Sequence, residues 1–214
     1  MDKSSVSAKA TAESVAAQDH PAWDPDWQRL RFVAMAQCDN LSCMEVATLK
    51  GTGGLQPIGR SFDYEEFYTP EHFDPSPLLI GVPKKCSEDV CSELHLAFAS
   101  AWGDAAAASA HIRTAVERLL DQLRVPKSAV AKGKRQRHTL HRRIELLAKQ
   151  HPEAGDLLLA VKWIGNAGVH SGALTKAEVM DALDILESAL TLLFNDHHKK
   201  VRKLAKRINS RRGP

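Results

Sequence analysis

Long apolar runs are missing from this sequence. The longest uninterrupted ones, such as Leu157–Val161 and Leu78–Ile80, contain only a few residues, whereas a membrane-spanning helix needs about 20. The residues that follow Met1 form no apolar signal core either. Because the 214 residues also include only four cysteines, we expect a cytoplasmic protein in a reducing environment that has no membrane partner.

An excess of one charge sign is missing as well. The chain has 29 Lys and Arg against 26 Asp and Glu, which does not predict a protein that coats polyanions uniformly. Aromatic residues make up only 6%, and Leu and Ala fill many apolar positions instead, which favours helices. The sequence also lacks a P-loop, a dinucleotide-binding glycine fingerprint, a Gly-x-Ser-x-Gly elbow and a His-Glu-x-x-His zinc-protease motif.

What is present predicts four parts. Residues 1–28 are rich in Ala and Ser and are expected to form a flexible tail. Residues 29–85 combine two short strand patterns with an acidic, aromatic and proline-rich stretch, which predicts a small β or extended element. Residues 86–196 have apolar positions at helical spacing, and residues 197–214 form a basic helix or tail. The predicted fold class is therefore mainly α, a bundle of about five helices preceded by a small β element.

The four cysteines form two C-x4-C pairs, Cys38/Cys43 and Cys86/Cys91. Zinc is commonly held by four thiolates or imidazoles from pairs with two to four intervening residues. Three interpretations stay open: a zinc site made by all four cysteines, a site made by the first pair with a histidine, and a knuckle without metal. In the last case Cys91 is a small core residue and Cys86 a loop thiol. Zinc is the only cofactor that the sequence suggests.

A second set of residues could carry proton or phosphate chemistry. Asn166 and His170 are one helical turn apart and share a helix face, and a histidine beside an amide can move a proton or bind a phosphate. The alternative is that both side chains cap carbonyls near a glycine-rich helix end. Arg113 and Glu117, also one turn apart, either pair with each other or face inward to orient His170 or bind a phosphate.

Positive charge is segregated along the chain, although the net charge is small. Nine of the 26 acidic residues lie in residues 61–104. A basic cluster follows, for which two interpretations stay open: a nucleic-acid-binding face, or only a solvated loop. Its members are Lys132, Lys134, Arg135, Arg137, Arg142 and Arg143.

Several strings together resemble the bacterial family called domain of unknown function 4145, over roughly residues 30–195. They include the C-x4-C of Phe32–Cys43, Ala110-His-Ile-Arg-Thr-Ala-Val-Glu117, Leu140-His-Arg-Arg-Ile144 and Lys162-Trp-Ile-Gly-Asn-Ala-Gly-Val-His170. This family is similar to the HEPN (higher eukaryote and prokaryote nucleotide-binding) helical superfamily, many of whose members are RNA-cutting toxins or phage-defence effectors. The resemblance implies a HEPN-like helical bundle and a homodimer.

The resemblance also implies site roles. In a HEPN ribonuclease that needs no metal, His170 would be the general acid or base, Asn166 would position the phosphate, Arg113 would stabilise charge and Glu117 would orient Arg113. The position of the usual HEPN arginine is Gly165, so either Arg113 or Lys162 replaces it or the chain is not a nuclease.

Because of this departure, the expected function is a non-catalytic or weakly catalytic RNA- or nucleotide-binding or adaptor module in phage defence or restriction. The alternative is a metal-independent endoribonuclease. Expected partners are RNA or another nucleic acid, or a toxin, nuclease or restriction subunit.

Overall fold

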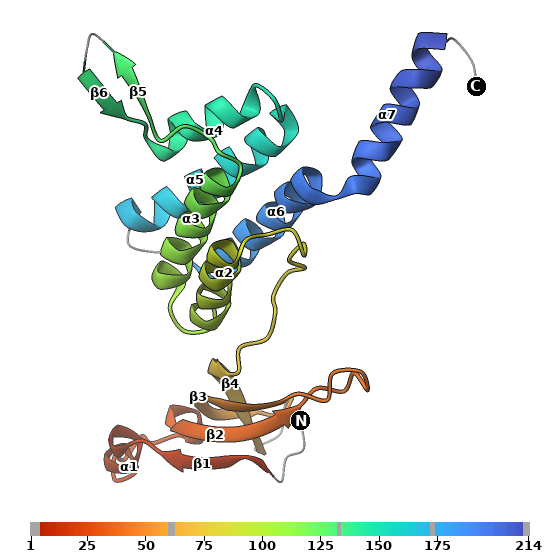
Figure 1. Ribbon diagram of the computed structural model, residues 1–214. Helices are drawn as coiled ribbons and strands as arrows, with labels where there is room; N and C mark the ends of the chain where they lie inside the picture. The colour runs from red at the N-terminus through yellow and green to blue at the C-terminus, as the bar shows by residue number, and fades with distance from the viewer. Residues whose placement is uncertain (1–4, 60–62, 132–133, 172–173, 212–214) are drawn as a thin grey trace. The chain divides into compact units, whose positions relative to one another are not determined.

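The computed structural model describes residues 5–59, 63–131, 134–171 and 174–211 (Figure 1). The chain divides into two compact units, Met1–Pro77 and Leu78–Pro214. Half of the structure is helical and 23% is strand. Each unit has its own hydrophobic cluster, so each is described separately.

The first unit is built on a four-stranded antiparallel sheet in the order β1-β2-β3-β4. Burial alternates along β2, where Phe32 and Ala34 are buried and Val33 and Met35 are exposed, as expected for a sheet with one covered face. Leu49 of β3 completes the small core. The elements are β1 (Ser7–Ala10), α1 (Ala12–Ala17), the 3-10 helix η2 (Pro25–Trp27), β2 (Arg29–Gln37), β3 (Val46–Pro57) and β4 (Tyr64–Asp74).

The pairing of β3 with β4 depends on a glycine. A Cβ atom at position 51 would lie 2.1 Å from the carbonyl oxygen of Thr69, so no larger residue fits without moving the backbone. The register of the two strands also shifts between Lys50 and Gly51. Gly51 therefore permits the close approach of β4 at this irregularity.

The second unit is mainly helical. Its core is lined by buried residues at helical spacing, such as Leu94, Leu119, Ile144, Leu158 and Leu190. Helices α2 and α3 pack together, and α5 packs against α3, α4 and α6. None of the helices in the described parts of the chain has the length and apolar composition needed to cross a membrane. The helices are α2 (Glu88–Ser100), α3 (Ala105–Gln122), α4 (Leu140–Ala148), α5 (Pro152–Ser171), α6 (Lys176–Phe194) and α7 (Asp196–Arg211).

Side-chain caps set the starts of three of these helices. Asp104 accepts a hydrogen bond from the backbone N–H of Ala107 at the start of α3, and Thr139 does the same for Arg142 at the start of α4. Thr175 and Glu178 form a complete capping box before α6. Each cap satisfies backbone donors that the first helical turn leaves free.

A short hairpin separates α3 from α4. Strands β5 (Ser128–Ala131) and β6 (Lys134–Arg137) pair antiparallel with each other and form a two-stranded sheet (Figure 1). All four residues of β6 are exposed. At the base of the hairpin, the N–H of His138 donates to the carbonyl oxygen of Lys127 at 2.8 Å, which holds the two ends of the segment together.

The prediction of a mainly α protein with about five bundle helices is wrong. The described residues contain seven α-helices, the four-stranded sheet of the first unit and the two-stranded sheet of the hairpin. The segment 1–28, expected to be a flexible tail, includes β1, which pairs with β2. Since backbone hydrogen bonds make this pairing, the side chains of Ser7–Ala10, which include no large apolar residue, did not indicate it. Four-residue strands such as β5 and β6 are likewise too short for their alternation to be recognised.

Candidate nucleic-acid interface

Arg143 is a buried cation that connects α3, α4 and the segment between them. Only 6% of the residue is exposed. Its Nη2 donates to Asp121 Oδ1 at 2.7 Å and to the carbonyl oxygen of Val125 at 3.1 Å, and its Nη1 donates to the carbonyl oxygen of Glu117 at 3.4 Å. A buried guanidinium is stable only when it is paired and hydrogen-bonded. These contacts therefore fix the start of α4 against the end of α3.

Asp121 binds a second cation. Nζ of Lys127 lies 2.8 Å from Asp121 Oδ2. Partial burial acts to raise the pKa of Asp121, but hydrogen bonds from Lys127 and Arg143 outweigh that effect and hold the pKa below its ordinary value. Asp121 is thus ionised at neutral pH, and its charge is already balanced by two cations.

A polar hollow of about 500 Å³ lies beside this cluster. It is bounded by α3, by the end of β6 and by the first residues of α4. We call it the basic hollow, because five cationic side chains and only two carboxylates line it, together with His138. The charged residues are Arg113, Arg118, Lys127, Arg137 and Arg143, with Glu117 and Asp121.

The carboxylates of the basic hollow do not balance all of its cations. Arg118 and Arg137 are exposed and, within the described part of the chain, have no carboxylate oxygen within 4 Å. A concave surface lined by one sign of charge concentrates the electric field and attracts the opposite charge. Guanidinium groups match the geometry of phosphate oxygens and can bind them with two parallel hydrogen bonds. The hollow is therefore suited to a phosphate-bearing ligand.

Arg113 links the basic hollow to α5. Its Nη1 donates to Oδ1 of Asn166 at 3.4 Å, and its Nε lies 3.6 Å from Oε1 of Glu117. The structure thus brings together three of the four residues predicted to be catalytic. The fourth, His170, lies one turn beyond Asn166 on α5, but its side chain is outside the described residues.

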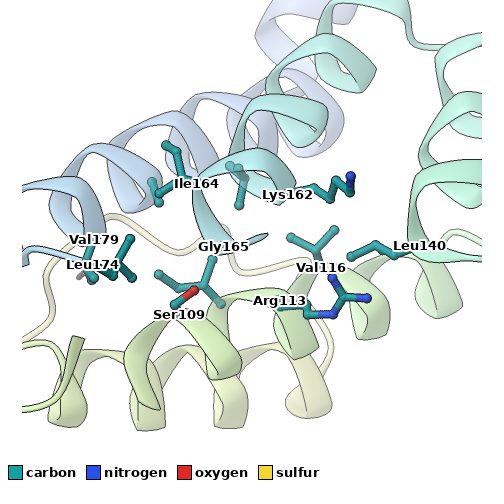
Figure 2. Close-up of a pocket in the computed structure, with 12 residues that line it drawn as sticks. Ser109, Arg113, Val116, Leu140, Lys162, Ile164, Gly165, Leu174 and Val179 are labelled. Atoms are coloured by element: carbon teal, nitrogen blue, oxygen red, sulfur yellow. The ribbon is translucent and has the colours of Figure 1, made fainter. Parts of the chain in front are cut away.

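Gly165 faces α3. Figure 2 shows Gly165 opposite Ser109, and a Cβ atom added to the glycine would lie 3.3 Å from Ser109 Oγ. This is a tight contact, and Ser109 would have to move by a few tenths of an ångström to admit a side chain at position 165. The guanidinium that lies beside Asn166 in the structure is that of Arg113 of α3. Nζ of Lys162, the other candidate for this role, lies 3.3 Å from the centre of the Trp163 ring instead. The cavity in Figure 2 has about 10 Å³ of free space, enough for one water molecule and not for a larger ligand.

The six residues predicted to bind nucleic acid lie in different environments. Three are exposed on β6, whereas Arg142 is exposed on α4 and its Nη1 lies 2.9 Å from Glu145 Oε2. Arg143 is buried and paired with Asp121, so it is not an exposed member of the basic cluster. Lys132 lies outside the described residues. The three on β6 are Lys134, Arg135 and Arg137.

The cysteines divide between the two units. Cys38 and Cys43 lie in the loop between β2 and β3, while Cys86 precedes α2 and Cys91 lies in its first turn. Burial, with a smaller effect of Cys91, raises the pKa of the Cys86 thiol to about 11. Among the described residues, no three His, Cys, Asp or Glu side chains are grouped closely enough to hold a metal ion. A zinc site stays a prediction.

Three charged residues of the basic hollow were not predicted from the sequence, namely Arg118, Asp121 and Lys127. Arg118 and Asp121 are spaced along α3 like ordinary surface residues, and no local pattern relates them to the hairpin. The one available signal was the absence of any acidic residue from 122 to 144. That gap marks the segment that contributes Lys127, Arg137 and Arg143 to the hollow.

The two units of the chain match two different families. Residues 96–211 match the family described as a domain of unknown function (DUF4145), a range that includes every residue of the basic hollow. The chain belongs to the DUF4145 family. Residues 1–73 match a second domain of unknown function, DUF8608, and this range corresponds to the unit with the four-stranded sheet. No curated protein and no solved structure matches the chain.

Proposed function

We propose that the DUF4145 part of this chain binds RNA or a related phosphate-bearing ligand in the basic hollow, as a binding or adaptor module rather than an efficient enzyme. One observation carries the proposal. Arg118 and Arg137, without carboxylate partners among the described residues, share a hollow of about 500 Å³ with Arg113. This volume is in the usual range for small-ligand sites.

The hollow is arranged for binding more clearly than for catalysis. His138 is the only histidine among the described residues that line it, whereas five of those residues are Arg or Lys. Arg113 is oriented by Glu117 and Asn166, and such preorganised guanidinium groups lose less conformational entropy when they bind a phosphate. These features support recognition of a phosphate.

The test is a titration of a fluorescently labelled, single-stranded RNA of about 12 nucleotides, followed by anisotropy at several salt concentrations without added metal. Each phosphate contact on a single strand contributes a salt slope of about 0.7, which is about a fivefold change in affinity per tenfold change in salt. We expect Arg118→Ala to weaken binding at 0.1 M salt about fivefold.

Arg142→Ala is the matched control, because Arg142 is also an exposed arginine on a helix but is balanced by Glu145. Binding of this variant should stay within twofold of the wild type. If the wild-type protein does not bind RNA at low salt, the proposed function is wrong.

A second candidate function is supported by the contact between Arg113 and Asn166. Through it an arginine lies beside Asn166, one helical turn before His170 in α5, although position 165 is glycine. The proposed roles in metal-independent RNA cleavage are proton transfer by His170, phosphate positioning by Asn166 and charge stabilisation by Arg113. Incubation of cellular RNA with the wild type and with His170→Ala, without metal, tests it: cleavage that the variant loses supports an endoribonuclease, and intact RNA in both samples leaves only the binding role.

The HEPN relationship, the homodimer, a toxin, nuclease or restriction subunit as partner, and a place in phage defence or restriction remain predictions from the resemblance. Co-purification of such a subunit with the full chain would support the adaptor role.

A further inference from the structure

The β5–β6 hairpin continues the positive surface of the basic hollow. Arg135 and Arg137 are two residues apart on β6, so they lie on the same face of the strand. Arg137 lines the basic hollow. The hairpin register pairs Val130 with Arg135 and Ser128 with Arg137. One face of the ribbon therefore carries two arginines that lead into the hollow.

The Arg135 side chain on this face has N–H donors that remain available to a ligand. Nε of Arg135 donates to Ser128 Oγ at 2.8 Å, across the hairpin. This bond orients the guanidinium and uses only one of its five N–H donors. The opposite face of β6 carries Lys134 and Gln136. One face of the strand therefore has two arginines, and the other has a single lysine.

From these positions we infer that the ligand of the basic hollow is a single strand of nucleic acid that extends along the arginine face of the hairpin, rather than a free mononucleotide or a duplex. The inference rests on the proposed function. Arg135 and Arg137 are separated by about 6.6 Å along the strand, so a nucleic-acid strand that enters the hollow can place a further phosphate against Arg135. A hollow of about 500 Å³ admits one small molecule, not a paired duplex.

The experiment compares adenosine monophosphate with the labelled single strand of about 12 nucleotides, using the full chain. Arg135→Ala should weaken binding of the strand about fivefold at 0.1 M salt and lower its salt slope by about 0.7. The same variant should leave the affinity for the mononucleotide unchanged. Lys134→Ala removes one charge from the opposite face of the same strand, so it should change the slope less than Arg135→Ala does.

Two results would overturn the inference and leave the proposed function intact. In the first, Arg118→Ala lowers the affinity for both ligands, but Arg135→Ala and Lys134→Ala change the affinity for the single strand equally or not at all. In the second, a duplex of the same length binds more tightly than the single strand. If neither ligand binds to the wild type, the proposed function fails and this inference fails with it.

Discussion

Asp121 and Arg143 show how single residues hold the basic hollow in shape. Asp121 accepts from Arg143 and lies against Lys127, so one carboxylate connects α3, the start of the hairpin and α4. Neither Asp121 nor Arg143 is free to bind a ligand. Their role is to position Arg118 of α3 and Arg137 of β6, because the contacts of Asp121 and Arg143 hold these elements together.

Replacement of Arg143 should destabilise the helical unit. Arg143→Met keeps an unbranched side chain but leaves the carbonyl of Val125 and one oxygen of Asp121 without their partner. Loss of one member of a buried ion pair typically costs about 3 kcal/mol. Urea unfolding followed by circular dichroism at 222 nm, where the helices of the second unit dominate, measures this loss. Arg142→Met is the control, and its free energy of unfolding should change by less than about 0.5 kcal/mol.

The ionisation of Asp121 should make stability depend on acid. Its pKa is lowered in the folded protein, first through the hydrogen bond from Lys127 against the opposing effect of burial. The unfolded chain then binds more protons, so the stabilisation is fully present above the unfolded pKa of about 4 and is lost as pH falls through the folded value.

The variant Asp121→Asn has no carboxylate at this position and therefore lacks the pH-dependent stabilisation. The variant should therefore be less stable than the wild type at pH 7, with a difference that shrinks toward pH 3. Urea unfolding at pH 7, 5 and 3 measures the difference, and a gap that stays constant would show that the charge of Asp121 does not stabilise the fold.

At the scale of elements, the β5–β6 hairpin is an attachment rather than part of the core. None of the residues of either strand belongs to the buried hydrophobic cluster of the unit. Among the described side chains of the two strands, only Ser128 is partly shielded from solvent. The hairpin therefore contributes charge and shape to the surface without stabilising the helices.

Shortening the hairpin should consequently change binding and not folding. Replacing residues 129–136 by Asn-Gly joins Ser128 to Arg137 through a two-residue turn, which suits the antiparallel pairing of these residues. We expect the melting temperature measured at 222 nm to stay within about 2 °C. Affinity for the single strand should fall, while affinity for adenosine monophosphate is retained. Loss of cooperative unfolding would contradict this view of the hairpin.

The helices were more predictable from sequence than the strands. Apolar residues at helical spacing over residues 86–196 indicated the region of α2 to α6, because this signal is local. Strand β1 and the hairpin depend on backbone pairing with a partner that local patterns do not reveal. For the same reason the Arg113–Glu117 pair was predictable from its spacing, whereas the contact between Arg113 and Asn166 depends on how α3 packs against α5.

At the scale of the whole molecule, a sheet unit and a helical unit match two different families. The basic hollow lies entirely within the DUF4145 part. The phosphate-binding activity that we propose therefore belongs to that part, and the family match alone does not name a ligand for it. Any ligand of the hollow must carry negative charge that complements its cations.

The most direct test is the salt dependence of single-strand binding by Arg118→Ala/Arg137→Ala, which removes the two cations of the hollow that have no carboxylate partner among the described residues. We expect the slope of log K against log salt to be smaller in magnitude by about 1.4 for the double variant than for the wild type, because two phosphate contacts are lost. A slope equal to that of the wild type would show that RNA, if it binds, binds elsewhere on the chain.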